Sequence, residues 1–304
     1  MKRFLLGACF VVTWSSGFVG TGLAGDEVGW RPLLAWRYVL TAVMLVTFCV
    51  TARPRGVRVN LTARELGRQV ILGLMAHVVF LGGVFAAAET GLDAGLSALV
   101  CALQPLLVTL ASRPLFGDRV HASQVAGLLL GLAGVGCSLG GVDMGATAEV
   151  GFVFASLIAL SASAMLERRW SPQTPLLLSV TMQTVTAAVA FTALAATTDT
   201  LSLPATGSSV RALLWLVVLS GLGGYCSYLA CLRTLGASAT STLLYLTPPV
   251  TTLWAWVMFA QRPGDSQWIG LGVVMLGVAV TLRGSNRHAR GPRSPAGVRR
   301  TSGR

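Results

Sequence analysis

Side chains that could bind a small solute occur one at a time within long apolar runs of this sequence. Trp14, Arg37, His77 and Gln104 each lie in a different run, and each run is long enough to cross a bilayer. Polar and ionisable side chains are costly inside a membrane, and those that occur there usually line a cavity between helices. We therefore predict a solute-binding cavity to which several helices contribute one residue each.

Three of these residues also have a purely structural interpretation. Trp14 could serve helix packing, although tryptophan prefers the membrane interface to mid-span positions. Arg37 could extend to the outer membrane surface instead of offering a counter-charge to an anionic solute. His77 could be a neutral side chain bonded to a neighbouring helix instead of a ligand or a proton relay.

Two prolines occupy matching places in a stretch that the sequence repeats. Pro105 and Pro248 are 143 positions apart (248 − 105 = 143), and the same offset relates Gln124 to Gln267. A proline inside a helix leaves a carbonyl one turn upstream without its partner and bends the helix. We predict that both prolines act as hinges beside the cavity, within an internal duplication.

The composition requires a membrane environment. Of 304 residues, 54% are hydrophobic and 11% are charged, and the mean hydropathy is +0.70. Backbone groups in a bilayer must be hydrogen-bonded within their own segment, so long unalternated apolar runs predict helices rather than barrel strands. The predicted fold is all-α, with ten transmembrane helices at about 4–24, 33–52, 69–88, 94–112, 122–140, 150–166, 176–197, 211–232, 237–260 and 267–283.

The basic residues determine the predicted orientation. Most of the 23 Lys and Arg side chains fall in alternate loops and at the two ends of the chain, which the positive-inside rule assigns to the cytoplasm. Both termini are then cytoplasmic, and five spans per half make the second half an inverted copy of the first. The predicted units are residues 1–140, residues 150–283 and a disordered basic cytoplasmic tail at 284–304.

The remaining features exclude several other classes of protein. The chain has 23 Lys and Arg residues against 11 Asp and Glu residues. Membrane topology and contact with lipid headgroups explain this positive charge, so we expect no nucleic-acid partner. The spans contain no arrangement typical of a nucleophile, a nucleotide site or a metalloprotease. All six cysteines lie in apolar runs, where thiols behave as small hydrophobes. We expect no enzyme activity, no cofactor and no metal site.

Glycine spacing in the fifth and tenth predicted helices allows other helices to approach closely. Such spacing favours helix packing, and a homodimer face is one use of it. The glycines concerned are Gly127, Gly131, Gly136, Gly140, Gly270 and Gly277.

The chain resembles EamA-type members of the drug/metabolite transporter superfamily over residues 4 to about 283. The resemblance rests on Trp14, on Ala35-Trp36-Arg37-Tyr38, on Ala102-Leu103-Gln104-Pro105 with Asp118, and on Tyr245-Leu246-Thr247-Pro248 with Gln261. It implies ten helices in two repeats and adds Tyr245 to the expected solute-binding residues. Gln261 departs from the family, which commonly has Glu there.

These observations together predict a secondary active transporter of the inner or plasma membrane. We expect it to export a small metabolite, an amino-acid-like solute or a drug by alternating access, without a nucleotide. Import of a similar solute is one alternative, and a non-transporting structural subunit of a membrane complex is another.

Proton coupling would require a titratable group in or near the membrane. His77 within the third predicted helix and Glu89 at its end, near the outer surface, meet this requirement. We predict Glu89 as the proton-coupling residue, because burial would favour proton uptake by a carboxylate.

The predicted orientation can be tested by cysteine labelling in a background that lacks the six native thiols. A cysteine introduced as Arg58→Cys should be protected from a membrane-impermeant reagent added outside intact cells, whereas Val142→Cys should react. The opposite pattern would overturn the inverted arrangement of the two halves.

Overall fold

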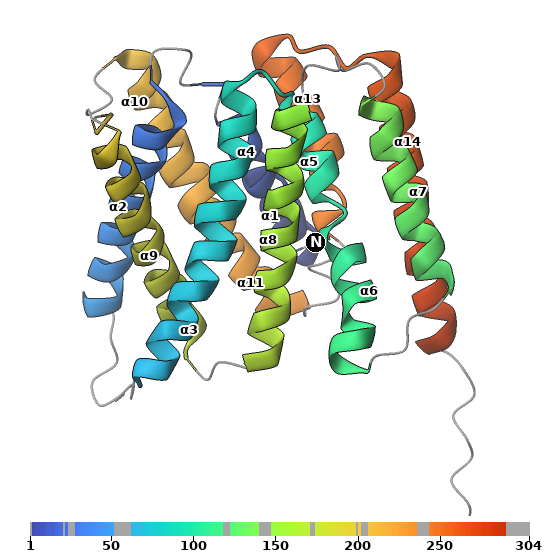
Figure 1. The fold of residues 1–304 in the computed structure, drawn as a ribbon, viewed down its shortest axis with the longest axis horizontal. Coiled ribbons are helices and arrows are strands. Elements are labelled where there is room, and N and C mark those ends of the chain that lie inside the picture. Colours follow the sequence, from blue (N-terminus) through green and yellow to red (C-terminus); the bar gives the residue numbers. More distant parts are fainter. Residues whose placement is uncertain are drawn as a thin grey trace, which may run out of the picture.

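A computed structural model describes most of the chain. The described residues are 2–20, 22–23, 28–51, 62–117, 122–139, 147–170, 174–198, 200–201, 206–235 and 243–289. Regular secondary structure in these ranges is entirely helical (Figure 1). The elements are α1 (Lys2–Val19), α2 (Trp30–Thr51), α3 (Ala63–Gly73), η2 (Leu74–Val79), α4 (Phe80–Glu89), α5 (Ala94–Cys101), α6 (Gln104–Phe116), α7 (Ala122–Leu139), α8 (Thr147–Trp170), α9 (Leu176–Thr197), α10 (Gly207–Leu214), η4 (Trp215–Gly224), α11 (Tyr225–Leu235), α13 (Thr247–Phe259) and α14 (Asp265–Ala289).

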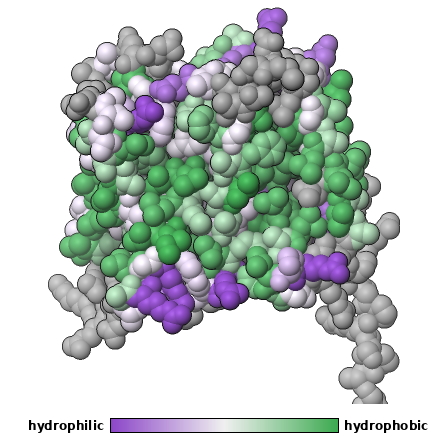
Figure 2. Space-filling model, in the orientation of Figure 1, coloured by the Kyte–Doolittle hydropathy of each residue, from purple (hydrophilic) through white to green (hydrophobic). Residues whose placement is uncertain are grey.

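The all-α fold class predicted from composition is confirmed, whereas the count of ten spans stays a prediction. Helices long and apolar enough to cross a membrane are Trp30–Thr51, Ala63–Glu89, Ala94–Phe116, Val150–Trp170, Leu177–Thr197 and Gly207–Tyr228, with shorter apolar helices at Ala122–Ser138 and Asp265–Val280. On the face that Figure 2 shows, hydrophobic residues form a band across the middle and hydrophilic residues lie towards the two ends. This distribution fits a protein that meets lipid at its middle and water at both ends.

Two of the long spans change helix type partway along. The span that starts with α3 passes through the π-helical segment η2 into α4, and the span that starts with α10 passes through η4 into α11. Both spans begin with a threonine cap: Thr62 accepts a hydrogen bond from the Glu65 N–H at 3.1 Å, and Thr206 accepts one from the Ser209 N–H at 3.4 Å. π-Helical turns are rare in proteins, and those that occur often lie at functional sites. These two spans are therefore candidates for cavity walls.

The two predicted proline hinges coincide with interruptions of helices. Ala102 and Leu103 form a turn between α5 and α6, directly before Gln104 and Pro105. Tyr245 and Leu246 form the equivalent turn directly before α13, in which Pro248 occupies the first turn. Proline has no N–H to donate to the carbonyl four residues upstream, so each helix ends and restarts at this point.

The carboxy-terminal helix is longer than the sequence analysis expected. The predicted tail begins at residue 284, but α14 extends to Ala289. The rest of that tail, 290–304, lies outside the described residues, as do residues 237–242 of the predicted ninth span. Asp118, which carries part of the family resemblance, also lies outside them.

Glycines bring α7 and α14 into close contact along their length, at one edge of the molecule in Figure 1. A Cβ atom added at Gly134 would lie 2.7 Å from the Gly270 carbonyl oxygen, and one added at Gly277 would lie 2.6 Å from the Gly127 carbonyl oxygen. These glycines therefore serve a contact within the chain. A homodimer stays a prediction, but these positions do not support it.

We predict that Gly270→Ala lowers the stability of the protein by about 1–3 kcal/mol, the usual cost of overpacking. The added methyl group would overlap Ser138 and the Gly134 carbonyl. Gly272→Ala is the matched control, because a Cβ there meets nothing within 4 Å, and it should leave stability unchanged or raise it by up to about 1 kcal/mol. Thermal unfolding in detergent checks both variants, and equal unfolding temperatures would contradict this account of the helix pair.

Candidate solute-binding cavity

A cavity of about 420 Å³ lies among the helices, within the range usual for small-molecule sites. Its wall includes residues from α1, α2, η2, α4, α5, α6, α8, α9, η4, α11 and α13. The wall is largely apolar, with polar or amphipathic side chains set into it singly. These are Trp14, Arg37, His77, Gln104, Ser163, Glu167, Ser179, Gln183, Ser220, Tyr225, Tyr228 and Thr247.

The structure brings together four of the five residues predicted to bind solute. Trp14, Arg37, His77 and Gln104 all line the cavity, and so does Pro105. The other three predicted site residues lie outside the wall.

Tyr245, Pro248 and Glu89 are not among the lining residues. Tyr245 is buried in the hydrophobic core, between the lining residues Leu244 and Thr247. Pro248 is buried in α13, one residue beyond Thr247. A direct contact of Tyr245 with a solute and the roles of Pro248 and Glu89 therefore stay predictions.

The helix interruptions contribute backbone to the cavity wall. In an uninterrupted helix, the N–H groups of residues 105 and 248 would bond the carbonyls of Cys101 and Leu244. Proline at both positions removes those bonds. Cys101 and Leu244 both line the cavity. Backbone without a helical partner is tolerated in a membrane where it lines a cavity, which agrees with this placement.

Arg37 lies in α2 and is only 4% exposed. Its Nη2 donates a hydrogen bond to the Ser220 hydroxyl at 3.2 Å, and its Cζ lies 5.4 Å from the Tyr38 ring centroid. Its Nη1 is buried and has no acceptor among the described residues. Arg37 therefore does not extend to the outer surface, because its side chain is enclosed between α2 and η4 and faces the cavity.

His77 is 1% exposed and joins three elements through hydrogen bonds. Its Nδ1 lies 3.1 Å from the Tyr38 hydroxyl of α2 and 2.7 Å from the Tyr225 hydroxyl of α11. These contacts agree with the interpretation of His77 as a side chain bonded to neighbouring helices. They also hold the imidazole at the cavity wall, beside Tyr225, which lines the cavity too.

An aromatic group forms one side of the cavity. The Trp14 ring lies 6.0 Å from the Tyr225 ring and 5.6 Å from the Tyr228 ring, measured between centroids. Phe10 lies behind them, 5.6 Å from Trp14. The group provides a flat apolar surface with polar edges, which suits apolar or aromatic parts of a solute.

Tyr225 and Tyr228 are functional candidates that the sequence analysis missed. A signal for them exists: the chain has four tyrosines, all within apolar runs, although tyrosine usually prefers the membrane interface. The other two, Tyr38 and Tyr245, are buried, whereas Tyr225 and Tyr228 are half-buried. Mid-span tyrosines could therefore have been treated like mid-span tryptophan.

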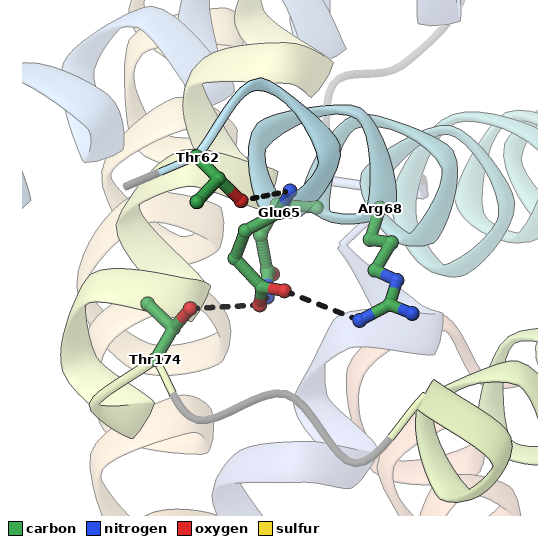
Figure 3. A network of polar contacts seen from close by, with 5 residues as sticks. Thr62, Glu65, Arg68 and Thr174 are labelled. Atoms are coloured by element: carbon green, nitrogen blue, oxygen red, sulfur yellow. Dashed lines mark hydrogen bonds and ion pairs between the residues drawn. The ribbon is translucent and has the colours of Figure 1, made fainter. Parts of the chain in front are cut away.

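A polar network connects α3 with the start of α9 and reaches the cavity wall. The Glu65 carboxylate accepts a hydrogen bond from Thr174 at 2.8 Å and pairs with Arg68 at 3.6 Å (Figure 3). Gln69 donates to Glu65 at 3.3 Å and accepts from Gln183, a lining residue, at 2.9 Å. The network fastens α3 to α9 and to the residues just before it.

Glu89 does not have the burial that favoured it as the proton-coupling residue. It is exposed at the end of α4, where its Oε1 accepts a hydrogen bond from the backbone N–H of Trp30 at 3.1 Å. Trp30 is the first residue of α2, so the carboxylate caps that helix and interacts favourably with its dipole. The observed contact is structural, and a coupling role for Glu89 stays a prediction.

The family of the chain follows from its similarity to known proteins. The EamA-like transporter family matches residues 1–140 and again residues 147–283. The probable terminal-alkyne amino-acid exporter of Streptantibioticus cattleyicolor is 25% identical over 93% of this chain and 95% of its own length. The uncharacterized inner membrane transporter YedA of Escherichia coli (strain K12) is 23% identical over 92% of this chain and 91% of its own length.

Two further similarities agree with this result. The probable amino-acid metabolite efflux pump of Escherichia coli (strain K12) is 31% identical over 44% of this chain and 42% of its own length. A solved crystal structure matches with a TM-score of 0.64 and 23% identity, covering 94% of this chain and 98% of the other. The crystal structure supports the fold alone.

The family match, the relatives and the apolar helices around a cavity together identify a multi-pass membrane transporter of the cell membrane. The chain belongs to the EamA-like transporter family, which confirms the resemblance found in its sequence.

Proposed function

We propose that this transporter exports a small metabolite, an amino-acid-like solute or a drug by alternating access, driven by a gradient and not by a nucleotide. The observation that carries the proposal is the cavity, whose wall combines Arg37 of α2 with Ser220 of η4 and with the aromatic side chains of α1 and α11. A site assembled from elements far apart in the sequence can open and close when those elements move against each other.

The proposal includes two inverted repeats of five helices each, residues 1–140 and 150–283, with both termini in the cytoplasm. The helix contacts support this arrangement. In predicted span order, the first span contacts the eighth and the third contacts the sixth, while the second contacts the seventh and the fifth contacts the tenth. If each span of the first half is exchanged with its equivalent in the second half, the contact of the first with the eighth becomes that of the sixth with the third, and the other two contacts stay the same. This is the pattern expected for two halves related by a two-fold axis.

The names of relatives support export more than import. One relative is described as a probable amino-acid exporter and another as a probable amino-acid metabolite efflux pump. Import of a similar solute is the second candidate, because one cavity with two access routes serves either direction.

Flux through the purified protein alone separates transport from a structural role. In proteoliposomes, a transporter should move an amino acid or a dye without other subunits, whereas an assembly subunit should not.

We further predict that Glu89→Gln abolishes uphill transport driven by a pH gradient and spares downhill exchange, because the amide can still accept the Trp30 N–H but cannot carry a proton. If Glu89→Gln and His77→Ala both still concentrate solute with only a proton gradient supplied, the proton does not pass through α4 or η2.

Pro105→Ala and Pro248→Ala should each slow transport while leaving the fold intact. Alanine restores a helical N–H and closes the interruption beside the cavity, and a barrier raised by about 1.4 kcal/mol slows transport about tenfold. Pro175→Ala is the matched control, because Pro175 stands at the start of α9 and interrupts no helix. Unchanged rates in both variants would assign the two prolines to packing.

A further inference from the structure

Arg37 carries a positive charge that its own protein surroundings leave partly unpaired. The side chain is 4% exposed, and its Nη2 donates a hydrogen bond to the neutral Ser220 hydroxyl. No described carboxylate lies within ion-pair distance of it, since the ion pair found in the described part of the chain joins Arg68 to Glu65. A guanidinium remains charged at any physiological pH, and a buried charge is costly unless an opposite charge or good acceptors compensate it.

Arg37 is a residue of the cavity wall, and one nitrogen of its guanidinium is unpaired within the described part of the chain. Arg37 lines the cavity, and its Nη1 is the nitrogen that lacks an acceptor among the described residues. Thr247 lines the same cavity, and its hydroxyl also lacks a described partner. Two residues that line one solute-sized cavity therefore each bury a polar atom without a described partner, which suits a site for a polar ligand group.

The position of Arg37 is fixed by its neighbours. Ser220 holds Nη2, the Tyr38 ring lies beside the guanidinium, and Gly17 leaves room for the Ser220 hydroxyl, since a Cβ there would stand 2.7 Å from it. A held guanidinium with one free edge loses little conformational freedom when it binds an anion.

The rest of the wall limits what the anion can be attached to. Among the lining residues, Arg37 is the side chain whose positive charge can attract an anion, whereas Glu167 is exposed and stands near the carboxy-terminal end of α8. Trp14 and Tyr228 provide an aromatic surface for an apolar part of the solute.

We propose that Arg37 binds the carboxylate of the transported solute through Nη1, and that this contact makes the cavity select carboxylate-bearing solutes with an apolar or aromatic part over cationic and neutral compounds. The proposal rests on the proposed transport function and deepens it by naming the group that is recognised.

The test compares amino acids with their amides, which keep the ammonium group and the side chain but lose the negative charge. L-Tryptophan, L-leucine and their amides are offered to the purified protein in proteoliposomes for flux and in detergent for thermal shift. The wild type should move or bind at least one acid at least about tenfold better than its amide, because a charge-assisted hydrogen bond to a buried site is worth about that factor.

Arg37→Gln should reduce this preference to within about twofold, and Arg37→Lys should retain part of it, because lysine keeps the charge but not the second donor that Ser220 holds. Arg31→Gln is the matched control on the same helix. Arg31 is not a lining residue and lies over the Trp30 ring, so its replacement should leave the preference unchanged. If Arg37→Gln does not fold, the comparison of Arg37→Lys with the wild type still reports whether the acid contact depends on the guanidinium.

Several outcomes would overturn the proposal. Amides handled as well as acids by the wild type, or an acid preference retained in Arg37→Gln, would show that Arg37 does not read the carboxylate. Stabilisation by inorganic phosphate and by neither amino acid would assign the guanidinium to a phosphate group instead. Binding of acids without flux of any compound would contradict the proposed transport function while supporting the role of Arg37.

Discussion

The structure depends on one constraint: inside a bilayer, each backbone N–H and C=O must find a partner without help from water. Long apolar helices satisfy this constraint, and the described part of the chain is built from them. The interruptions before Pro105 and Pro248 are exceptions, and the residues whose carbonyls lose a helical partner, Cys101 and Leu244, lie in the cavity wall. The places where the chain departs from regular helix thus coincide with the place where a solute can be held.

The same constraint explains how polar side chains are arranged around the cavity. Ser15, Ser16 and Thr41 bond backbone carbonyls in their own or a neighbouring helix and so bury their hydroxyls at low cost. His77 is satisfied by two tyrosines. Arg37 differs from these, because it lines the cavity and one of its nitrogens is buried without a described acceptor. This contrast separates side chains that complete the fold from the side chain that we propose recognises the solute.

Sequence reasoning succeeded where the deciding property is local. Apolar runs predicted helices, and Pro105 and Pro248 predicted the interruptions, because a missing N–H acts within one turn of its own residue. It failed where the outcome depends on a neighbouring helix. Glu89 was preferred for proton coupling because burial could favour proton uptake, but it is exposed and its environment is set by the start of α2, where it accepts a hydrogen bond from the Trp30 N–H.

Side-chain direction and helix pairing were also beyond the sequence. Tyr225 and Tyr228 face the cavity because of how α11 is rotated about its axis, and no residue near them in the chain fixes that rotation. Gly127 and Gly277 were candidates for a dimer face, but their partners are each other's helices, α7 and α14. The segments η2 and η4 had no expected counterpart, because π-helical turns arise from packing and not from a distinct residue type.

The central claim is that the helices enclose a cavity that water and solute can enter, and thiol accessibility measures this most directly. In a parent without native cysteines, Ala102→Cys and Ser163→Cys would lie in the cavity wall, whereas Leu129→Cys and Val257→Cys would lie on the outer apolar surface, where the native side chains are 62% and 72% exposed. A small hydrophilic thiol reagent should modify the first pair and not the second, because lipid covers the outer positions and excludes the reagent. Equal lack of reaction at all four positions would contradict a hydrated cavity and with it the transport mechanism proposed for this chain.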